Sequence, residues 1–266
     1  MSYQKTLKLT AEGQLHRTFF EDFDPDNYPL KALQERYGCR LTYFVESGCP
    51  KSLSPLLLKI YHPIKYKVPF WKRIGGYMRS PNAKYAFRIN DYLSKKKVDI
   101  SPKTYAMTVL KKGYKTHSTY LFQEYIPNTQ RFLPAYQACR QESEKKHLIK
   151  ELAKTLAMLH QLRICHFDIG FDNIIVQKDR VYIIDYDDAI LLPKAVGFLH
   201  GLCKIFDLNI ILFACHKALT RQETMDFFHA YCDGLGWSKR KVKWMKRFIN
   251  KKFLSNVSDN AKVSNE

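Results

Sequence analysis

The sequence predicts an α+β protein of two lobes, with a strand-rich first half and a mainly helical second half. Short runs of aromatic and branched residues, separated by turn signals, fill the first half. In the second half apolar residues recur at helical spacing. The 266 residues, 45% of them hydrophobic, suffice for two lobes with cores. We expect a β-rich lobe over residues 1–126, a helical lobe over 127–254 and a disordered polar tail over 255–266.

The first half contains a series of short predicted strands and one helix. The strands cover residues 29–36, 40–46, 55–61, 105–111 and 119–125, and the helix covers 82–96. Turn signals at Tyr37-Gly38 and at 47–50 separate the first three strands. Tight turns between short strands favour an antiparallel sheet.

The second half begins with a long predicted helix over 142–162, in which Leu148, Leu152, Leu156 and Leu159 keep close to helical period. Two short strands, 173–176 and 181–185, follow as a hairpin. Helices then resume from about residue 197 and run to 253. The most apolar stretch, 196–219, is interrupted by polar residues that include Asp207, so we expect a buried helix of a lobe rather than a membrane span.

The charge is strongly basic and unevenly distributed. The formal net charge is +19. Between residues 49 and 123 the only acidic side chains are Asp91 and Asp99, among many lysines and arginines. Such a surface favours a polyanionic partner, either nucleic acid, anionic lipid or a phosphorylated glycan. A basic surface that only keeps the protein soluble is the alternative.

The cysteines and the N-terminus favour a cytoplasmic protein. The seven cysteines are odd in number, and no pair has CxxC spacing. We therefore expect reduced thiols and no zinc site. The first residues lack a long apolar run, so we expect no signal peptide.

One segment carries a pattern of catalytic chemistry. His166, Asp168 and Asn173 follow the long helix, and a hairpin then ends at Asp185. Transfer of a phosphoryl group from a nucleotide needs positioning, metal ions and neutralised charge more than covalent chemistry. Asp168 would orient the attacking hydroxyl and accept its proton. Asn173 and Asp185 offer the hard oxygen ligands that suit Mg²⁺. The alternative is that these residues only form turns and strand ends.

This order of elements resembles the protein-kinase-like phosphotransferases, and most closely the bacterial lipopolysaccharide core kinases that phosphorylate heptose or Kdo. The heptose kinases are the nearer group. The resemblance covers about residues 29–207 and is specific over 156–188. It implies a two-lobed kinase-like fold, ATP and Mg²⁺ as cofactors, and a lysine for the α- and β-phosphates at Lys59. It also implies a hinge near Glu124 and Ile126 whose backbone holds adenine.

Three features depart from the family pattern. No GxGxxG occurs in the first half, and the turn at Tyr37-Gly38 offers a single glycine over the phosphates. No glutamate lies between Glu46 and Glu124 to pair with the strand lysine, which leaves Asp91 as a weak candidate. The metal motif begins with Asp185 but reads Asp-Tyr-Asp. We also expect His166 to brace the loop by hydrogen bonding rather than act as a base.

A basic helix is predicted over 238–253, near the C-terminus. Val242, Met245, Ile249 and Phe253 fall on one face of it, among many lysines and arginines. Such a helix can lie on an anionic membrane. Alternatively, the apolar face packs on the lobe. A lipid-linked anionic glycan at the cytoplasmic leaflet accounts for both basic regions, so we expect a peripheral inner-membrane enzyme and no nucleic-acid partner.

Two other functions fit parts of the pattern. A soluble kinase for an aminoglycoside, choline or a similar small molecule would share the fold, but such enzymes tend to line the acceptor cleft with acids. An inactive kinase-like scaffold that binds membrane or nucleic acid would explain the missing glutamate. Asp168, Asn173 and Asp185 argue against a scaffold. The sequence leaves the oligomeric state open.

Overall fold

The computed structural model describes residues 3–36, 40–45, 47–50, 53, 55–62 and 83–249. The predicted turn at Tyr37-Gly38 and the predicted tail over 255–266 lie outside these residues. The chain divides into two compact units. The first, here called the sheet unit, comprises Met1–Pro127 and Asp185–Asp188. The second, the helical unit, comprises Asn128–Ile184 and Ala189–Glu266.

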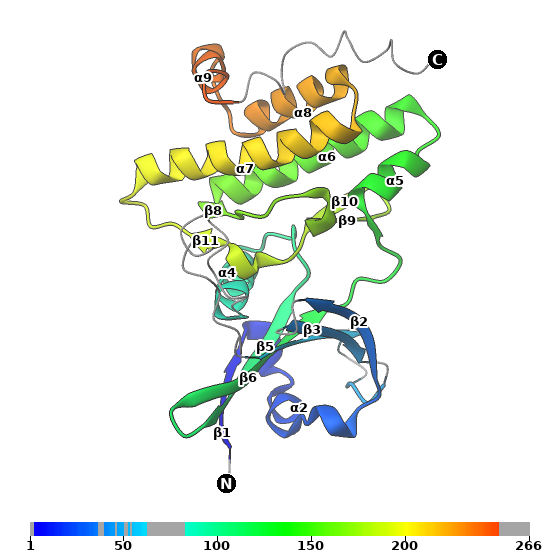
Figure 1. The fold of residues 1–266 in the computed structure, drawn as a ribbon, viewed down its shortest axis with the longest axis vertical. Helices are drawn as coiled ribbons and strands as arrows, with labels where there is room; N and C mark the ends of the chain where they lie inside the picture. The colour runs from blue at the N-terminus through cyan, green and yellow to red at the C-terminus, as the bar shows by residue number, and fades with distance from the viewer. Residues whose placement is uncertain are drawn as a thin grey trace. The chain divides into compact units, whose positions relative to one another are not determined.

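The sheet unit is built on a six-stranded antiparallel sheet in the order β1-β5-β6-β4-β3-β2 (Figure 1). Its strands are β1 (Gln4–Leu9), β2 (Leu30–Arg36), β3 (Arg40–Val45), β4 (Leu56–Tyr61), β5 (Thr104–Lys112) and β6 (Lys115–Glu124). Its helical segments are α1 (Ala11–Gln14), α2 (Arg17–Asp22), η1 (Pro25–Asn27), α4 (Ala83–Lys95) and η3 (Tyr186–Asp188). The five predicted strands and the predicted helix over 82–96 are confirmed.

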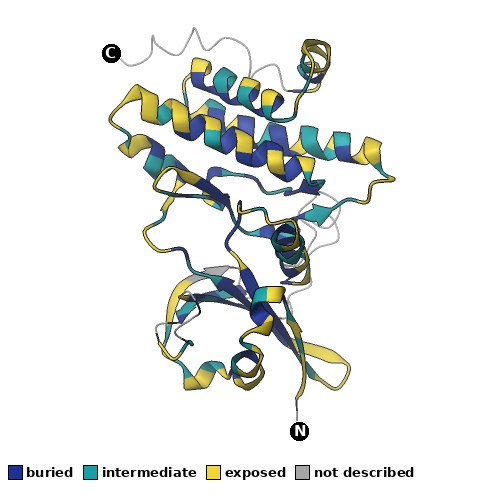
Figure 2. Cartoon of the chain, turned by 180° about the vertical axis from the view of Figure 1, so that it is seen from behind, coloured by how far each residue is buried: buried dark blue, intermediate teal, exposed yellow. Residues whose placement is uncertain are grey.

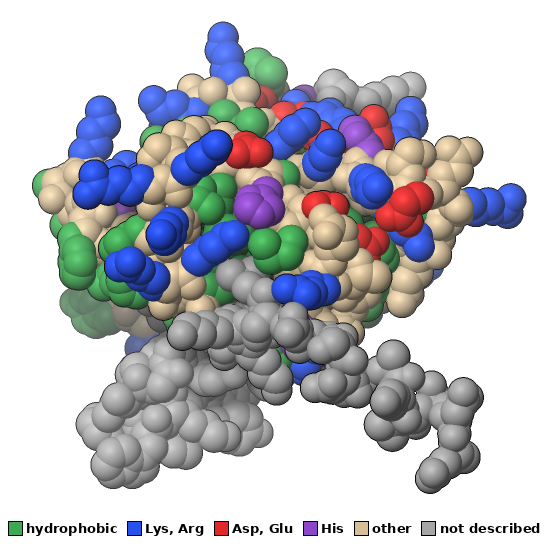
Figure 3. Space-filling model, turned by 90° about the horizontal axis from the view of Figure 1, so that it is seen from above, with side chains coloured by type: hydrophobic (Ala, Val, Ile, Leu, Met, Phe, Trp, Pro, Cys, Tyr) green, Lys and Arg blue, Asp and Glu red, His purple; other side chains and the backbone are tan. Residues whose placement is uncertain are grey.

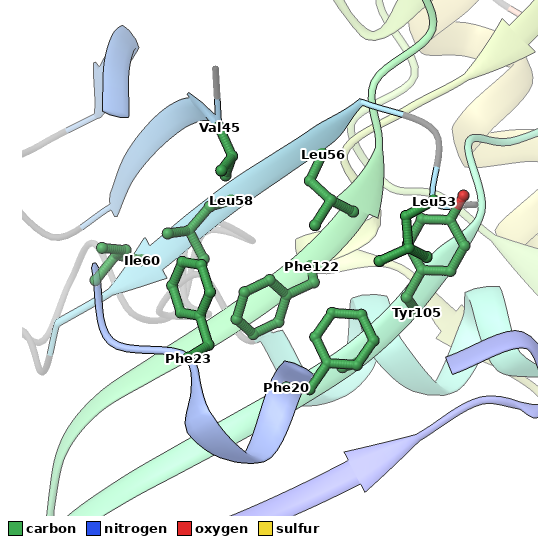
Figure 4. Packing of buried hydrophobic residues seen from close by; sticks show 10 residues of the cluster. Phe20, Phe23, Val45, Leu53, Leu56, Leu58, Ile60, Tyr105 and Phe122 are labelled. Carbon is green, nitrogen blue, oxygen red and sulfur yellow. The ribbon is translucent and has the colours of Figure 1, made fainter. Parts of the chain in front are cut away.

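The core of the sheet unit lies between the sheet and the first helices. Phe20 and Phe122 are fully buried, and their ring centroids lie 5.1 Å apart. Phe23 meets Phe122 edge-on at 4.9 Å. In Figure 4, Leu58 of β4 lies beside Phe23, in the same buried cluster as Phe20 and Phe122. The strand that carries Lys59 is therefore fixed by apolar packing on both sides of that residue.

The helical unit contains long helices and two small antiparallel sheets, β10-β9-β7 and β11-β8. Its helices are α5 (Phe132–Ala138), α6 (Glu142–Gln161), η2 (Phe171–Asn173), α7 (Gly197–Ala218), α8 (Arg221–Gly234) and α9 (Lys239–Met245). Its strands are β7 (Gln130–Arg131), β8 (Ile164–Cys165), β9 (Ile174–Gln177), β10 (Arg180–Ile183) and β11 (Ile190–Leu191). The predicted long helix is α6, and the predicted hairpin is β9–β10, which pairs Ile183 with Ile174.

Helix α7 differs from the buried helix that the sequence predicts. It is long and apolar enough to cross a membrane by length and composition alone, yet only 33% of its most apolar window is buried. One side packs inside the unit; its buried residues include Asp207, Leu208, Ile211, Leu212 and Cys215. The other side is exposed, with Phe198, Leu199, Leu202, Phe206 and Phe213 between 46% and 79% accessible. Figure 2 shows both buried and exposed residues along the helices of this unit.

Of the two alternatives for the basic C-terminal helix, the structure favours packing of its apolar face on the lobe. Met245 and Ile249, which belong to the face predicted to meet a membrane, are each 2% exposed. This face packs inside the helical unit, as the second alternative predicts. Trp244 and Phe248 are about half exposed instead, with ring centroids 4.5 Å apart. Residues 250–253 of the predicted helix lie outside the described residues.

Candidate active site

Asp168 and Asn173 are joined by direct hydrogen bonds in the helical unit. They lie on the loop between β8 and β9, and η2 ends this loop at Asn173. The Asn173 amide donates from Nδ2 to the Asp168 carbonyl at 2.7 Å and to Asp168 Oδ2 at 3.0 Å. These bonds fix which end of the amide is the donor. The Asn173 Oδ1 accepts no hydrogen bond from the described residues, which leaves it available to a cation.

Asp207 of α7 holds the start of the same loop. Its side chain is fully buried, and it accepts hydrogen bonds from the backbone N–H groups of His166 and Phe167, each at 2.7 Å. The His160 Nε2 lies 3.1 Å from Asp207 Oδ2 and donates to it. Sequence reasoning missed this residue. The signal was present, because an acid inside a mainly apolar helix must find buried donors.

His166 braces the loop, as the sequence predicts. It is fully buried, and its Nε2 donates to the carbonyl of Ile184 at 3.0 Å. Its Nδ1 accepts from the backbone N–H of Asp168 at 3.3 Å. The ring therefore links the loop that carries Asp168 to the chain immediately before Asp185. Phe167 has a φ of 64°, so the backbone between these anchors lies in the left-handed region.

Lys59 and Asp185 meet in the sheet unit. Lys59, on β4, is 7% exposed, and its Nζ lies 3.5 Å from Asp185 Oδ1. Arg40, the first residue of β3, pairs with both Asp185 oxygens, and its Nη2 lies 3.0 Å from Oδ2. Asp185 has a φ of 68°, a conformation that Asp tolerates better than most residues. Sequence reasoning gave Arg40 no role, because its partner is 145 residues away.

Asp187 completes this buried cluster. Its Oδ2 lies 2.5 Å from Arg40 Nη1, and its Oδ1 accepts from the Tyr61 hydroxyl at 2.8 Å. Burial and the nearby Asp185 raise the pKa of Asp187, although Lys59 and Arg40 oppose this. Burial alone lowers the pKa of Arg40, but Asp185 and Asp187 together raise it above its ordinary value. The guanidinium is thus held charged between two carboxylates. The Asp187 side chain is therefore buried and paired rather than solvated.

Asp91 is not placed to pair with Lys59. It lies on α4 and binds Lys95, one turn further along the same helix, at 2.7 Å. Such an i,i+4 ion pair is a common arrangement on a helix surface. The weak candidate drawn from the sequence is therefore wrong, and the carboxylate that meets Lys59 in the described residues is Asp185.

The predicted adenine contacts lie at the end of the sheet unit. The backbone N–H of Glu124 donates to the Lys103 carbonyl at 2.8 Å, and its side chain accepts from the Lys103 N–H at 3.1 Å. Ile126, two residues further on, is 8% exposed. The adenine-binding role of Glu124 and Ile126 stays a prediction.

The side-chain oxygens of Asn173 and Asp185 are of the types that Mg²⁺ takes as ligands. Among the described residues no group of three or more His, Cys, Asp or Glu side chains could hold a metal by itself. Asn173 supplies an amide oxygen without a described donor, and Asp185 supplies a buried carboxylate. Mg²⁺ in nucleotide sites is held by one or two such ligands together with phosphate oxygens and water.

The fold defined by these units is the protein-kinase-like fold, with an antiparallel sheet in the first unit and helices in the second. The family model of the protein kinase domain matches residues 100–201. This stretch includes β5, β6, α6 and the whole Asp168–Asp185 segment.

A search of solved structures supports the same fold. The chain is similar to a structure described as WaaP in complex with acyl carrier protein, with a TM-score of 0.58 and 18% sequence identity. The match covers 90% of this chain and 99% of that chain. No curated protein sequence matches the chain.

Proposed function

We propose that the protein is an ATP-dependent kinase that phosphorylates a sugar hydroxyl, heptose or Kdo, of the lipopolysaccharide inner core. The main evidence is the hydrogen-bonded pair of Asp168 and Asn173, on a loop that Asp207 and His166 hold in place. A pair of turn residues would not require a buried carboxylate to support it. The match of residues 100–201 to the protein kinase domain model supports a catalytic role for this loop.

In this reaction Asp168 would orient the acceptor hydroxyl and accept its proton. The acceptor hydroxyl hydrogen-bonds to its carboxylate, which orients the oxygen toward the γ-phosphorus of ATP. The bond from this oxygen to phosphorus forms while the bond from phosphorus to the β,γ-bridging oxygen breaks, which yields ADP. The hydroxyl proton passes to Asp168. The Asn173 amide keeps the carboxylate in position through its bond to Oδ2.

Asn173 and Asp185 would hold magnesium, and Lys59 would neutralise the nucleotide phosphates. When bound, the metal would supply positive charge against the phosphate oxygens. Lys59 is nearly buried on a rigid strand, so its ammonium is held in place before a nucleotide arrives. Glu124 and Ile126 would provide the backbone for adenine.

The choice of acceptor rests on resemblance and on charge. The sequence resembles lipopolysaccharide core kinases, and the fold is similar to that of the structure described as WaaP in complex with acyl carrier protein. A net charge of +19 favours an anionic acceptor over the cationic acceptors of aminoglycoside or choline kinases.

Phosphate transfer to purified lipopolysaccharide tests the proposal. Wild-type protein, ATP, magnesium and core lipopolysaccharide lacking inner-core phosphate should yield a product one phosphate heavier by mass spectrometry. Asp168→Ala should abolish the product while ATP still binds, and Asp172→Ala, at the exposed neighbour, should keep most of the activity. Normal transfer by Asp168→Ala would refute the catalytic role. Phosphorylation of choline or an aminoglycoside instead would refute the acceptor.

We also propose that the enzyme works at an anionic membrane through the exposed side of α7. Phe198, Leu202 and Phe206 lie one turn apart on this side, at 79%, 46% and 50% exposure. Exposed lysines, Lys194 and Lys217, lie near the two ends of the helix. An exposed apolar stripe of this kind marks a site of protein or membrane interaction, and the basic residues beside it favour an anionic surface.

The end of α9 and the residues that follow it extend this surface. The Asn209 amide of α7 lies 3.4 Å from the Phe248 carbonyl, so the half-exposed Trp244–Phe248 pair lies close to α7. Lys243 and Arg247 beside that pair are exposed. In Figure 3, Lys and Arg side chains are spread across the face in view, and Asp and Glu side chains are few. These charges favour a lipid surface over a second copy of the same basic chain.

Co-sedimentation with vesicles tests this surface. Wild-type protein should bind phosphatidylglycerol vesicles more tightly than phosphatidylcholine vesicles. The Phe198→Ser/Phe206→Ser variant should lose about 100-fold in affinity, because each buried aromatic side chain contributes about 1.5–3 kcal/mol. Leu15→Ser, at an 81% exposed leucine of the sheet unit, serves as the control and should bind as wild type does. Unchanged binding by the double variant, or a dimer that depends on these phenylalanines, would contradict the proposal.

A further inference from the structure

Arg40 occupies an unusual place for an arginine. Its side chain is 3% exposed, and it lies between Asp185 and Asp187. The Nη atoms bind both oxygens of Asp185 and one oxygen of Asp187. The Arg40 Nε is buried and has no hydrogen-bond partner in the described part of the chain. One donor of the guanidinium therefore remains for a further acceptor.

The same contacts conflict with metal binding. Both Asp185 oxygens are engaged by the guanidinium in a paired, bidentate fashion. A magnesium ion on Asp185 needs at least one of these oxygens, and its charge would repel the guanidinium at such a distance. Arg40 and the metal therefore compete for one carboxylate. Two cations, Arg40 and Lys59, already balance the two carboxylates of the cluster.

We propose that Arg40 is a nucleotide-phosphate ligand that takes the place of magnesium on Asp185 while no nucleotide is bound. The inference rests on the proposed function of this site. With Mg-ATP bound, Asp185 would hold the metal and the Arg40 guanidinium would contact the phosphate oxygens. A guanidinium suits this exchange, because its planar fork binds carboxylate and phosphate alike.

Asp187 and Tyr61 explain how Arg40 stays in place during the exchange. Asp187 bonds the guanidinium at 2.5 Å and is itself held by the Tyr61 hydroxyl at 2.8 Å. This anchor does not involve Asp185, so Arg40 can release one carboxylate and keep the other. Arg40 thus supplies a second fixed cation beside Lys59, in a chain where the expected glutamate partner of that lysine is missing.

Binding measurements on Arg40→Gln test the proposal without relying on turnover. Mn²⁺, followed by electron paramagnetic resonance, serves as the probe for the magnesium site. Without nucleotide, Arg40→Gln should bind Mn²⁺ at least tenfold more tightly than wild type, because Asp185 is released. Its affinity for ATP in the presence of a chelator should fall at least tenfold, because a charge-assisted phosphate contact is lost. Arg17→Gln, at an exposed arginine of the same unit, should change neither value.

A measurement on unmutated protein covers the case in which Arg40→Gln fails to fold. With ¹⁵N- and ¹³C-labelled wild-type protein, the Arg40 Nε–Hε resonance, assigned by through-bond correlation to the Arg40 backbone, should shift on addition of Mg-ATP. An unshifted resonance in a protein that binds Mg-ATP would overturn the role of Arg40 alone. Wild-type protein that binds no ATP would overturn the proposed function itself. Equal Mn²⁺ and ATP affinities in wild type and a folded Arg40→Gln would also overturn the inference.

Discussion

Replacing Asp207 with asparagine should destabilise the helical unit through three hydrogen bonds. One carboxylate oxygen accepts from the Phe167 N–H at 2.7 Å, and the other accepts from the His166 N–H at 2.7 Å and from His160 at 3.1 Å. An amide has only one oxygen, so at least one backbone N–H would face an NH₂ group. A lost bond to a charged acceptor costs about 1.5–3 kcal/mol, and an unsatisfied buried donor costs about 1–3 kcal/mol more. We expect a loss of about 3 kcal/mol or more.

Urea denaturation, followed by circular dichroism, measures this loss. Asp226→Asn on α8 is the matched control, because Asp226 bonds only the exposed Gln222 amide among the described residues and should change stability by less than about 0.5 kcal/mol. Hydrogen exchange adds a local readout: the amides of His166 and Phe167 should lose protection in Asp207→Asn. If Asp207→Asn is as stable as Asp226→Asn and both amides stay protected, Asp207 does not hold the loop.

Three further changes probe the two units separately. Burial lowers the pKa of His200 from 6.5 to about 4, so as the pH falls the unfolded chain takes up a proton before the folded chain does. The free energy of unfolding should therefore fall by up to about 3 kcal/mol as the pH drops between these two pKa values. In urea titrations His200→Leu should remove this pH dependence. Burial alone would raise the pKa of Glu223, but hydrogen bonds from neighbouring hydroxyls lower it below 4.5. Glu223→Gln should therefore lower the free energy of unfolding by about 1 kcal/mol at neutral pH. The difference in stability between this variant and wild type should vanish as the pH falls through the folded-state pKa of Glu223. A methyl group on Gly13 would lie 1.9 Å from the Tyr105 carbonyl oxygen, so Gly13→Ala should cost about 3 kcal/mol in thermal denaturation, whereas Gly197→Ala, with open space, should not destabilise.

Local patterns were sufficient for much of the fold. The predicted strands of the sheet unit and helix α6 match the structure because their hydrophobic periods are strong and their turn signals are clear. The first strand, β1, was missed because it lies at the sheet edge, where no residue except Leu7 and Leu9 is even partly buried. The exposed side of α7 was misread, since an apolar helix has the same sequence whether or not a neighbour covers it.

The candidate site was only partly predictable for a different reason. Asp168 and Asn173 are five residues apart, so a local motif sufficed to place them together. Arg40 meets Asp185 across 145 residues, and Asp207 meets Phe167 across 40. No local spacing encodes such contacts. The sequence shows that no glutamate is available on the predicted helix to pair with Lys59. The cluster of Arg40, Asp185 and Asp187 beside Lys59 could be seen only in the structure.

Binding of Mn²⁺ with ATP tests most directly whether Asn173 and Asp185 hold the metal of one nucleotide complex. Electron paramagnetic resonance titrations should show one tight Mn²⁺ ion in wild-type protein with ATP. Asn173→Leu and Asp185→Asn should each weaken that ion at least tenfold, while Asp172→Ala leaves it unchanged. Equal Mn²⁺–ATP affinity in wild type and in both folded variants would contradict the account.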